Sequence, residues 1–232
     1  SVEGEHGPLF ALRTPPFAMT MALGSTEAAH ELGRARALAE EKGEVPPLPG
    51  VVAPTALARA FAEGFADASG RLGDVKTRLR LYDLERVEPP KRLPRGSFRA
   101  AEARDVESLV AFYAAFVEEL GGPSVGVRST VERGVLGGRM YVWEVDGEPV
   151  SMAQRGGDTP NSTRLNLVFT ERASRGKGYA AACVAAVSQA VFDSGKRFAC
   201  LNADLANATS NALYLRLGYR PVCDLDEWDL SM

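Results

Sequence analysis

Histidine and cysteine are scarce in this sequence, and their positions limit the chemistry open to it. The two histidines, His6 and His30, lie near the start of the chain, so its C-terminal half has no zinc site and no histidine-based triad. The three cysteines, Cys183, Cys200 and Cys223, are an odd number without Cys-x-x-Cys spacing. We expect buried core thiols, no disulfide framework and no bound metal.

Long apolar runs and an excess of basic charge are also missing. No run approaches the roughly 20 apolar residues of a membrane helix, and the N-terminus has no basic segment followed by a hydrophobic one. The net charge is −3 and the pI about 5.6, so composition gives no support to nucleic-acid binding. We expect a cytoplasmic protein with no nucleic-acid partner and no membrane partner.

The N-terminal part, residues 1–94, is predicted to be a small α/β lobe. Its pattern indicates an extended run, a helix, a short strand, a helix and a half-buried strand, over residues 9–23, 26–42, 51–52, 54–68 and 75–82. Pro89, Pro90 and Pro94 then mark a semi-rigid linker, which places the domain boundary there.

The C-terminal part, residues 95–232, is predicted to be a mixed α/β sheet with helices on both faces. Strands are expected at 97–101, 140–145, 149–154, 163–170, 198–202, 219–223 and 227–230, and helices at 105–120, 128–136, 179–194 and around Tyr214. Asp146-Gly147 is typical of a tight hairpin turn between two of these strands.

The most informative stretch runs from Leu165 to Tyr179, where an alternating strand leads into a basic turn and then a helix. Gly176 and Gly178 allow close approach of the backbone to a ligand, and the first amides of the helix have no partners inside it. Arg175 and Lys177 add positive charge, so an anion the size of a pyrophosphate suits this turn. The spacing fits neither a Walker loop nor Gly-x-Gly-x-x-Gly, which argues against nucleoside triphosphates and NAD as ligands.

Two motifs in this half resemble those of the GNAT (GCN5-related N-acetyltransferase) superfamily. Residues 175–180, Arg-Gly-Lys-Gly-Tyr-Ala, resemble the Arg/Gln-x-x-Gly-x-Gly/Ala signature that binds the pyrophosphate of acetyl-CoA. Residues 207–219 resemble the family's Asn-rich helix with its Leu-Tyr pair and closing Gly-Tyr. The resemblance covers about residues 97–232. The sequence departs from the family's common pattern at Arg172, where many members carry proline.

The resemblance implies transfer of an acetyl group from acetyl-CoA to a primary amine by direct attack. The pantetheine arm would bind backbone groups of the strand before the turn, next to a splay between neighbouring strands, and amides of the same strand would polarise the thioester carbonyl. The cofactor-binding residues that it implies are Val168, Phe169, Thr170, Arg175, Gly176, Lys177, Gly178, Tyr179, Ala180, Ala181, Asn207 and Asn211.

Tyr214 matches the family's tyrosine that protonates the departing CoA thiolate; the alternative is a core tyrosine on an amphipathic helix. Asn207 and Asn211 could equally be an N-cap and a surface amide. The general base is not assigned. Its candidates by residue type are Glu118, Glu119, Glu144 and Asp204.

The expected partner is a small-molecule or peptide amine, with a homodimer left open. Loops 121–130 and 155–162 are expected to shape the acceptor pocket together with the N-terminal part. That part is either a degenerate GNAT-like lobe, in which Pro54-Thr55 replaces the phosphate turn, or an unrelated α/β extension. Two rivals to the enzyme are a non-catalytic acyl-CoA-sensing or partner-binding module and a transferase that uses aminoacyl-tRNA. Retention of Tyr214 argues against the first, and the absence of a basic face argues against the second.

Overall fold

The computed structural model describes residues 2–4, 7–121 and 125–231, and its contacts divide the chain into two compact units. The first unit holds Ser1–Leu81, Ala203–Asn207 and Val222–Met232, and the second holds Tyr82–Asn202 and Ala208–Pro221. This grouping differs from the boundary expected near residue 94, because the end of the chain returns to the first unit as a strand. His6, and residues 122–124 of the expected acceptor loop 121–130, lie outside the described residues.

The described residues of the first unit form two helices, and its sheet neighbours follow the order β3-β4-β5-β12-β6. Its elements are β1 (Val2–Gly4), β2 (Gly7–Leu9), β3 (Ala11–Leu12), β4 (Met19–Met21), α1 (Thr26–Glu41), β5 (Gly50–Pro54), α2 (Thr55–Ser69), β6 (Asp74–Leu84) and β12 (Arg220–Asp229), the last two of which continue into the second unit. β4 and β5 are parallel and joined by α1, whereas β12 pairs with β5 antiparallel. The predicted alternation of strands and helices is confirmed, and the origin of this part as a degenerate lobe stays a prediction.

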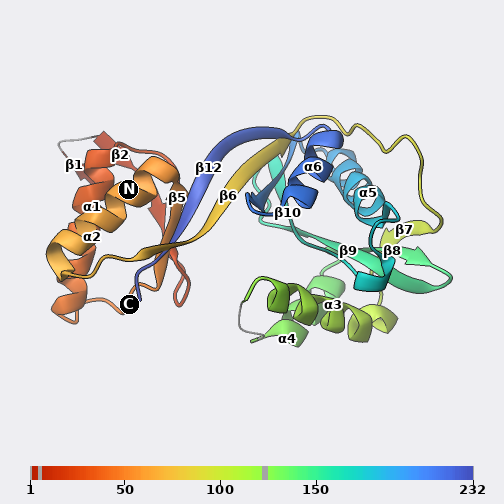
Figure 1. Ribbon diagram of the computed structural model, residues 1–232, viewed down its shortest axis with the longest axis horizontal. Coiled ribbons are helices and arrows are strands. Elements are labelled where there is room, and N and C mark those ends of the chain that lie inside the picture. The colour runs from red at the N-terminus through yellow and green to blue at the C-terminus, as the bar shows by residue number, and fades with distance from the viewer. Residues whose placement is uncertain (1, 5–6, 122–124, 232) are drawn as a thin grey trace. The chain divides into compact units, whose positions relative to one another are not determined.

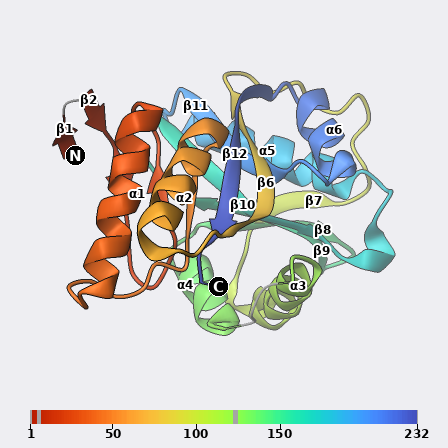
Figure 2. The ribbon, with the colours of Figure 1, turned by 60° about the vertical axis from the view of Figure 1, so that its left-hand side comes forward.

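Helices α1 and α2 pack backbone against backbone (Figure 2). A Cβ atom added to Gly33 would lie 2.1 Å from the Phe61 carbonyl oxygen, and one added to Gly64 would lie 2.0 Å from the His30 carbonyl oxygen. Only glycine permits such an approach. The close contact lets Phe61 and Phe65, both fully buried, fill the core between the helix pair and the strands.

The last strand corrects a sequence prediction, because β12 is one continuous strand and not two strands at 219–223 and 227–230. The intervening acidic residues suggested a break. Asp224 instead accepts hydrogen bonds from the Arg80 guanidinium at 2.6 and 2.9 Å, and Asp226 accepts one from Thr55 Oγ1 at 3.2 Å. Because both carboxylates have hydrogen-bond partners, the strand continues through these acidic residues.

The second unit is a mixed sheet with the neighbour order β11-β10-β9-β8-β7. Its elements are β7 (Ser97–Ala100), the 3-10 turn η1 (Ala103–Asp105), α3 (Val106–Glu119), α4 (Val127–Leu136), β8 (Met140–Val145), β9 (Glu148–Gly156), β10 (Ser162–Thr170), the 3-10 turn η2 (Arg172–Ser174), α5 (Tyr179–Asp193), β11 (Phe198–Asp204) and α6 (Ala208–Arg216). Helix α5 covers one face and α3 and α4 cover the other (Figures 1 and 2). This confirms the predicted fold class.

The core beneath α3 and α4 joins these helices to the strands of the site. Leu109, Val131, Met140 and Met152 are fully buried in it, and Phe169 of β10 is buried with them. Among the cysteines, only Cys183 is buried as expected; Cys200 on β11 and Cys223 on β12 are half-buried. Burial raises the pKa of the Cys183 thiol to about 12, so this thiol stays protonated at neutral pH.

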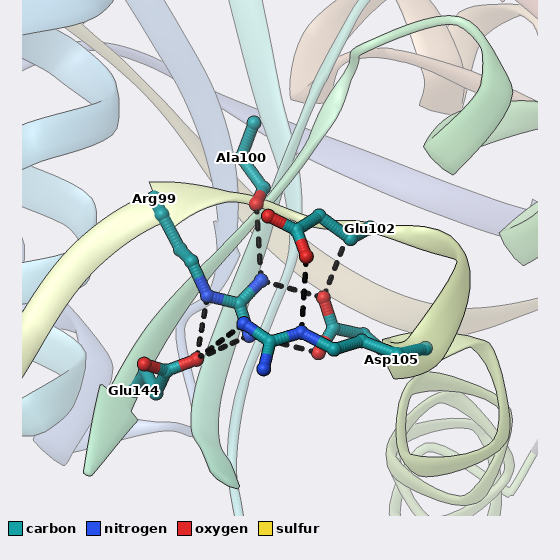
Figure 3. A network of polar contacts seen from close by, with 6 residues as sticks. Arg99, Ala100, Glu102, Asp105 and Glu144 are labelled. Atoms are coloured by element: carbon teal, nitrogen blue, oxygen red, sulfur yellow. Dashed lines mark hydrogen bonds and ion pairs between the residues drawn. The ribbon is translucent and has the colours of Figure 1, made fainter. Parts of the chain in front are cut away.

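The start of α3 is held by a network of charged side chains (Figure 3). Arg99 donates two hydrogen bonds to Asp105, at 2.6 and 2.9 Å, and a third to Glu144 at 2.6 Å. Asp105, only 2% exposed, also accepts the backbone N–H of Glu102 at 2.7 Å. Burial alone would raise the pKa of Asp105, but the hydrogen bonds from Arg99 and Glu102 outweigh it and lower the pKa.

Replacing Asp105 with asparagine is expected to reduce the free energy of unfolding by about 2–3 kcal/mol, because Arg99 loses its buried partner. Since the folded-state pKa of Asp105 is lowered, its contribution is present above the unfolded pKa, near 4, and is lost as pH falls through the folded value. Urea unfolding between pH 3 and pH 7 measures both effects. Glu107, changed to glutamine, is the control: its ion pair with Arg128 is exposed, so its loss should reduce stability much less than the loss of Asp105. Equal losses in the two variants would contradict the assignment.

Candidate functional site

Strands β10 and β11 pair only over their first residues and then separate. The parallel ladder joins Ser162 to Phe198, Thr163 to Ala199 and Arg164 to Cys200, the last pair recorded among the described residues. Both strands continue beyond it. The far part of β10 therefore presents one backbone edge without a strand partner in this unit, as the predicted splay requires.

A bulge in β10 reshapes the same segment on its other side. Asn166 pairs with Gln154 of β9, and the next recorded pair is Phe169 with Met152, so one extra residue is accommodated between them. Leu167 lies there with a φ of 49°, a left-handed conformation that is costly for a branched side chain. Bulges of this kind re-aim backbone groups next to functional sites. Val168, Phe169 and Thr170, the residues expected to bind pantetheine, are at and after this bulge.

The turn after β10 supplies the conformation expected of an anion site. Gly176 and Gly178 have φ of 78° and 86°, and nothing lies within 4 Å of a Cβ built on either. Helix α5 begins at Tyr179 without a side-chain cap, and the first of its recorded backbone bonds is from Ala182 N–H to the Gly178 carbonyl. The preceding amides and the positive end of the helix dipole thus lie at an exposed turn, in which two glycines leave space beside the backbone. Its predicted members are brought together: Arg175, Gly176, Lys177, Gly178, Tyr179, Ala180 and Ala181.

Two arginines beside the turn are held by one carboxylate. Glu119, at the end of α3, accepts from Arg172 Nε at 3.0 Å and from Arg175 Nη2 at 2.9 and 3.0 Å. Arg175 also donates from Nε to the Thr170 carbonyl at 3.0 Å, and its guanidinium lies 5.2 Å from the centre of the Phe169 ring. The turn, the end of β10 and the end of α3 are thereby fixed to one another. Arg172, noted above as a departure from proline, takes part in this anchoring.

Tyr214 lies on α6 in a cluster of tyrosines. Its side chain is 7% exposed, and its ring centre is 6.1 Å from that of Tyr82 and 5.7 Å from that of Tyr219. Burial, with a smaller effect of Tyr82, raises the pKa of Tyr214 to about 12. The phenol is therefore fully protonated at neutral pH and can donate a hydrogen bond to a developing anion.

The two asparagines of the second motif have different settings. Asn211 Oδ1 accepts a hydrogen bond from the Tyr82 hydroxyl at 2.7 Å, so its oxygen is engaged with the tyrosine cluster. Asn207 belongs to the first unit, where its backbone N–H donates to the Asp204 carbonyl at 3.0 Å. Its part in the cofactor site, like that of Asn211, stays a prediction.

Three of the four candidate bases are held by hydrogen bonds or ion pairs. Burial would raise the pKa of Glu119, but hydrogen bonds from Arg172 and Arg175 outweigh it and lower the pKa. Glu144, 18% exposed, accepts from Arg99 and Arg104. Asp204 Oδ1 accepts a backbone N–H at 2.8 Å. Glu118 is exposed. Among the described residues, no group of three or more His, Cys, Asp or Glu is arranged as a metal site, and no helix has the length and apolarity to span a membrane.

Replacing Glu119 with glutamine is expected to leave kcat within about threefold of wild type, because a carboxylate held by two arginines is a poor base at neutral pH. The affinity for CoA should rise a few-fold, since Arg172 and Arg175 lose the anion that neutralises them. Steady-state kinetics and calorimetry at two salt concentrations test this, with the exposed neighbour variant Glu118→Gln as control. A hundredfold fall in kcat would instead identify Glu119 as the base.

The bulge at Leu167 and the ion pairs of Glu119 with Arg172 and Arg175 were not predicted from the sequence. No residue signal marks the bulge, because leucine rarely adopts positive φ. The ion pairs join residues more than 50 positions apart, and only the packing of α3 against β10 brings them together.

Comparison with known proteins identifies the family of the chain. The family model of the Acetyltransferase (GNAT) family matches residues 80–219, and the chain belongs to this family. No curated protein sequence matches the chain.

Solved structures share the fold at low sequence identity. A GCN5-related N-acetyltransferase from Kribbella flavida has a TM-score of 0.68 and 16% identity, covering 98% of this chain and 88% of that one. An acetyltransferase from the GNAT family of Colwellia psychrerythraea has a TM-score of 0.67 and 12% identity, covering 98% and 82%. A GCN5-related N-acetyltransferase from Sphaerobacter thermophilus has a TM-score of 0.62 and 16% identity, covering 95% and 75%. At these identities, the likeness concerns the fold alone.

Proposed function

We propose that this protein transfers an acetyl group from acetyl-CoA to a primary amine on a small molecule or peptide. The observation that carries the proposal is the separation of β10 from β11 directly before the glycine turn at the start of α5. An open strand edge suits the amide-bearing pantetheine arm, and the turn suits the pyrophosphate. Membership of the GNAT family supports acetyl transfer in general.

The chain's residues fit this substrate in charge and in space. Gly176 and Gly178 leave room for phosphate oxygens at the helix N-terminus, and Arg175 and Lys177 supply positive charge beside them. Acetyl-CoA supplies an acyl group already activated as a thioester. Backbone amides near the bulge, around Val168, would donate to the carbonyl oxygen as it gains charge.

The reaction itself needs a neutral amine and a protonated leaving group. The amine nitrogen forms a bond to the carbonyl carbon, the carbon–sulfur bond breaks, and the amide product and CoA thiol leave. We assign to Tyr214 the donation of a hydrogen bond, and then of its proton, to the sulfur. The proton that the nitrogen loses passes to solvent, and solvent reprotonates Tyr214. Transfer from a phenol of pKa about 12 to a thiolate is uphill at equilibrium, so the stabilisation occurs mainly as hydrogen bonding while charge develops.

Calorimetric titration of the protein with acetyl-CoA, CoA and NADH in parallel tests the binding site. Thiol release against a panel of amines then tests turnover. We expect binding of both CoA species without binding of NADH, and thiol release with one class of amine. Binding without release for any amine would favour a sensing module, and no CoA binding would refute the assignment of the turn.

A further inference from the structure

Two unpaired buried oxygens lie where the site strands separate. Among the described residues, four buried side-chain polar atoms have no hydrogen-bond partner: Arg36 Nη1, Asn166 Oδ1, Asn202 Oδ1 and Trp228 Nε1. Asn166 is on β10 and Asn202 is on β11, both in the second unit. A buried carbonyl oxygen without a donor is unfavourable in a folded protein, so two of them on neighbouring strands require an explanation.

The strand register places the two carboxamides on the same face of the sheet. Arg164 and Cys200 form the last parallel pair, and Asn166 and Asn202 each follow two residues later. Both asparagine side chains therefore lie on the same face of the sheet as the side chains of Arg164 and Cys200. A Cβ built on Gly156 would lie 3.3 Å from Asn166 Nδ2, which fixes Asn166 over the neighbouring strand β9. The two carboxamides therefore border the separation of β10 from β11 just beyond its last ladder pair.

The face in question is the one covered by α3 and α4. Asn166 pairs with Gln154 of β9, which lies two residues after the buried Met152 on the same face. Met152 packs in the core beneath α3 and α4. Arg155, the residue after Gln154 on β9, points to the opposite face, where it donates to Ser194 Oγ at the end of α5 at 2.9 Å. The carboxamides are thus separated from α5 by the sheet.

We infer that Asn166 and Asn202 bind the amino group of the acceptor, an assignment that rests on the proposed function. Both side chains are only partly buried, so rotation of each carboxamide can present its oxygen to a ligand. Two acceptor oxygens match the two N–H groups of a neutral primary amine and leave its lone pair free for attack. A carboxamide neither takes the proton nor carries charge, so the pair positions the nitrogen and is not the general base.

The alternative is that the two oxygens hold a structural water. The two explanations predict opposite effects on the stability of the free protein when an asparagine is replaced with an apolar residue of similar shape. Removal of an unsatisfied oxygen kept for a substrate is neutral or stabilising for the free protein, whereas removal of a ligand of a structural water is destabilising. Stability of the free protein therefore distinguishes them without any turnover measurement.

The test uses Asn166→Leu and Asn202→Leu in the full chain, with Cys200→Ala on the same face of β11 as control. We expect each leucine variant to melt no lower than wild type, with a rise of up to about 4 °C. We also expect kcat/KM for the amine to fall at least about tenfold, an unchanged Kd for acetyl-CoA, and a smaller preference for a primary amine over its N-methyl analogue.

Three outcomes would overturn the inference. A lower melting temperature with unchanged kinetics for the amine would assign the oxygens to a structural water. Wild-type turnover with an unchanged preference between primary and N-methyl amine in both variants would overturn the acceptor site alone. Absence of turnover by the wild-type protein with every amine would overturn the acceptor site together with the proposed function.

Discussion

A glutamate at position 178 is expected to weaken CoA binding at least about 100-fold, or about 2.8 kcal/mol. Gly178 is the N-cap of α5, and its turn is exposed. The new carboxylate would occupy the positive end of the helix, where the pyrophosphate of CoA is expected, and would repel it. Calorimetry with CoA and acetyl-CoA measures the loss directly.

Gly195 provides a matched control at the other end of the same helix. Its φ of 85° is close to the 86° of Gly178, and nothing lies within 4 Å of a Cβ built on either glycine. Gly195→Glu therefore introduces the same charge and a similar left-handed backbone cost, about 1–2 kcal/mol, without approaching the turn. It should bind CoA like wild type. Equal losses of affinity in the two variants would show that the effect comes from folding and not from the site.

The sequence was sufficient to predict the parts of the site that depend on residues close together along the chain. The glycines at 176 and 178, the basic residues between and before them, and the helix start at Tyr179 are close together along the chain. Their backbone conformation follows from residue type, and the structure has both glycines in the left-handed region. The alternating pattern of β10 likewise predicted its strand, although not the bulge within it.

Features that depend on long-range pairing could not be predicted. The continuity of β12 depends on Arg80 and Thr55, which neutralise or bond carboxylates that otherwise indicate a turn. The grouping of the chain into units depends on the pairing of β12 with β5, more than 160 residues earlier. The unpaired oxygens of Asn166 and Asn202 are visible only once the register of β10 and β11 is known.

Replacing Tyr214 with phenylalanine is expected to lower kcat about 100-fold, the lower limit usual for a positioned proton donor, with Kd for CoA within about twofold of wild type. The ring is retained, so its contacts with Tyr82 and Tyr219 should persist. Because the pKa of Tyr214 is about 12, the wild-type rate should show no alkaline decline from this group below about pH 10. An unchanged kcat would show that Tyr214 is a core residue and not the proton donor.

Tyr219→Phe separates loss of a buried phenol from loss of the catalytic one. The Tyr219 hydroxyl is hydrogen-bonded to Ser188 Oγ at 2.8 Å, away from any predicted role in the reaction. Its removal should reduce the free energy of unfolding by about 1 kcal/mol while kcat is retained. The opposite pattern is expected for Tyr214→Phe, in which turnover falls and stability changes little. Parallel losses of turnover in both variants would mean that the tyrosine cluster supports the site as a whole, and that Tyr214 has no separate role as the donor to sulfur.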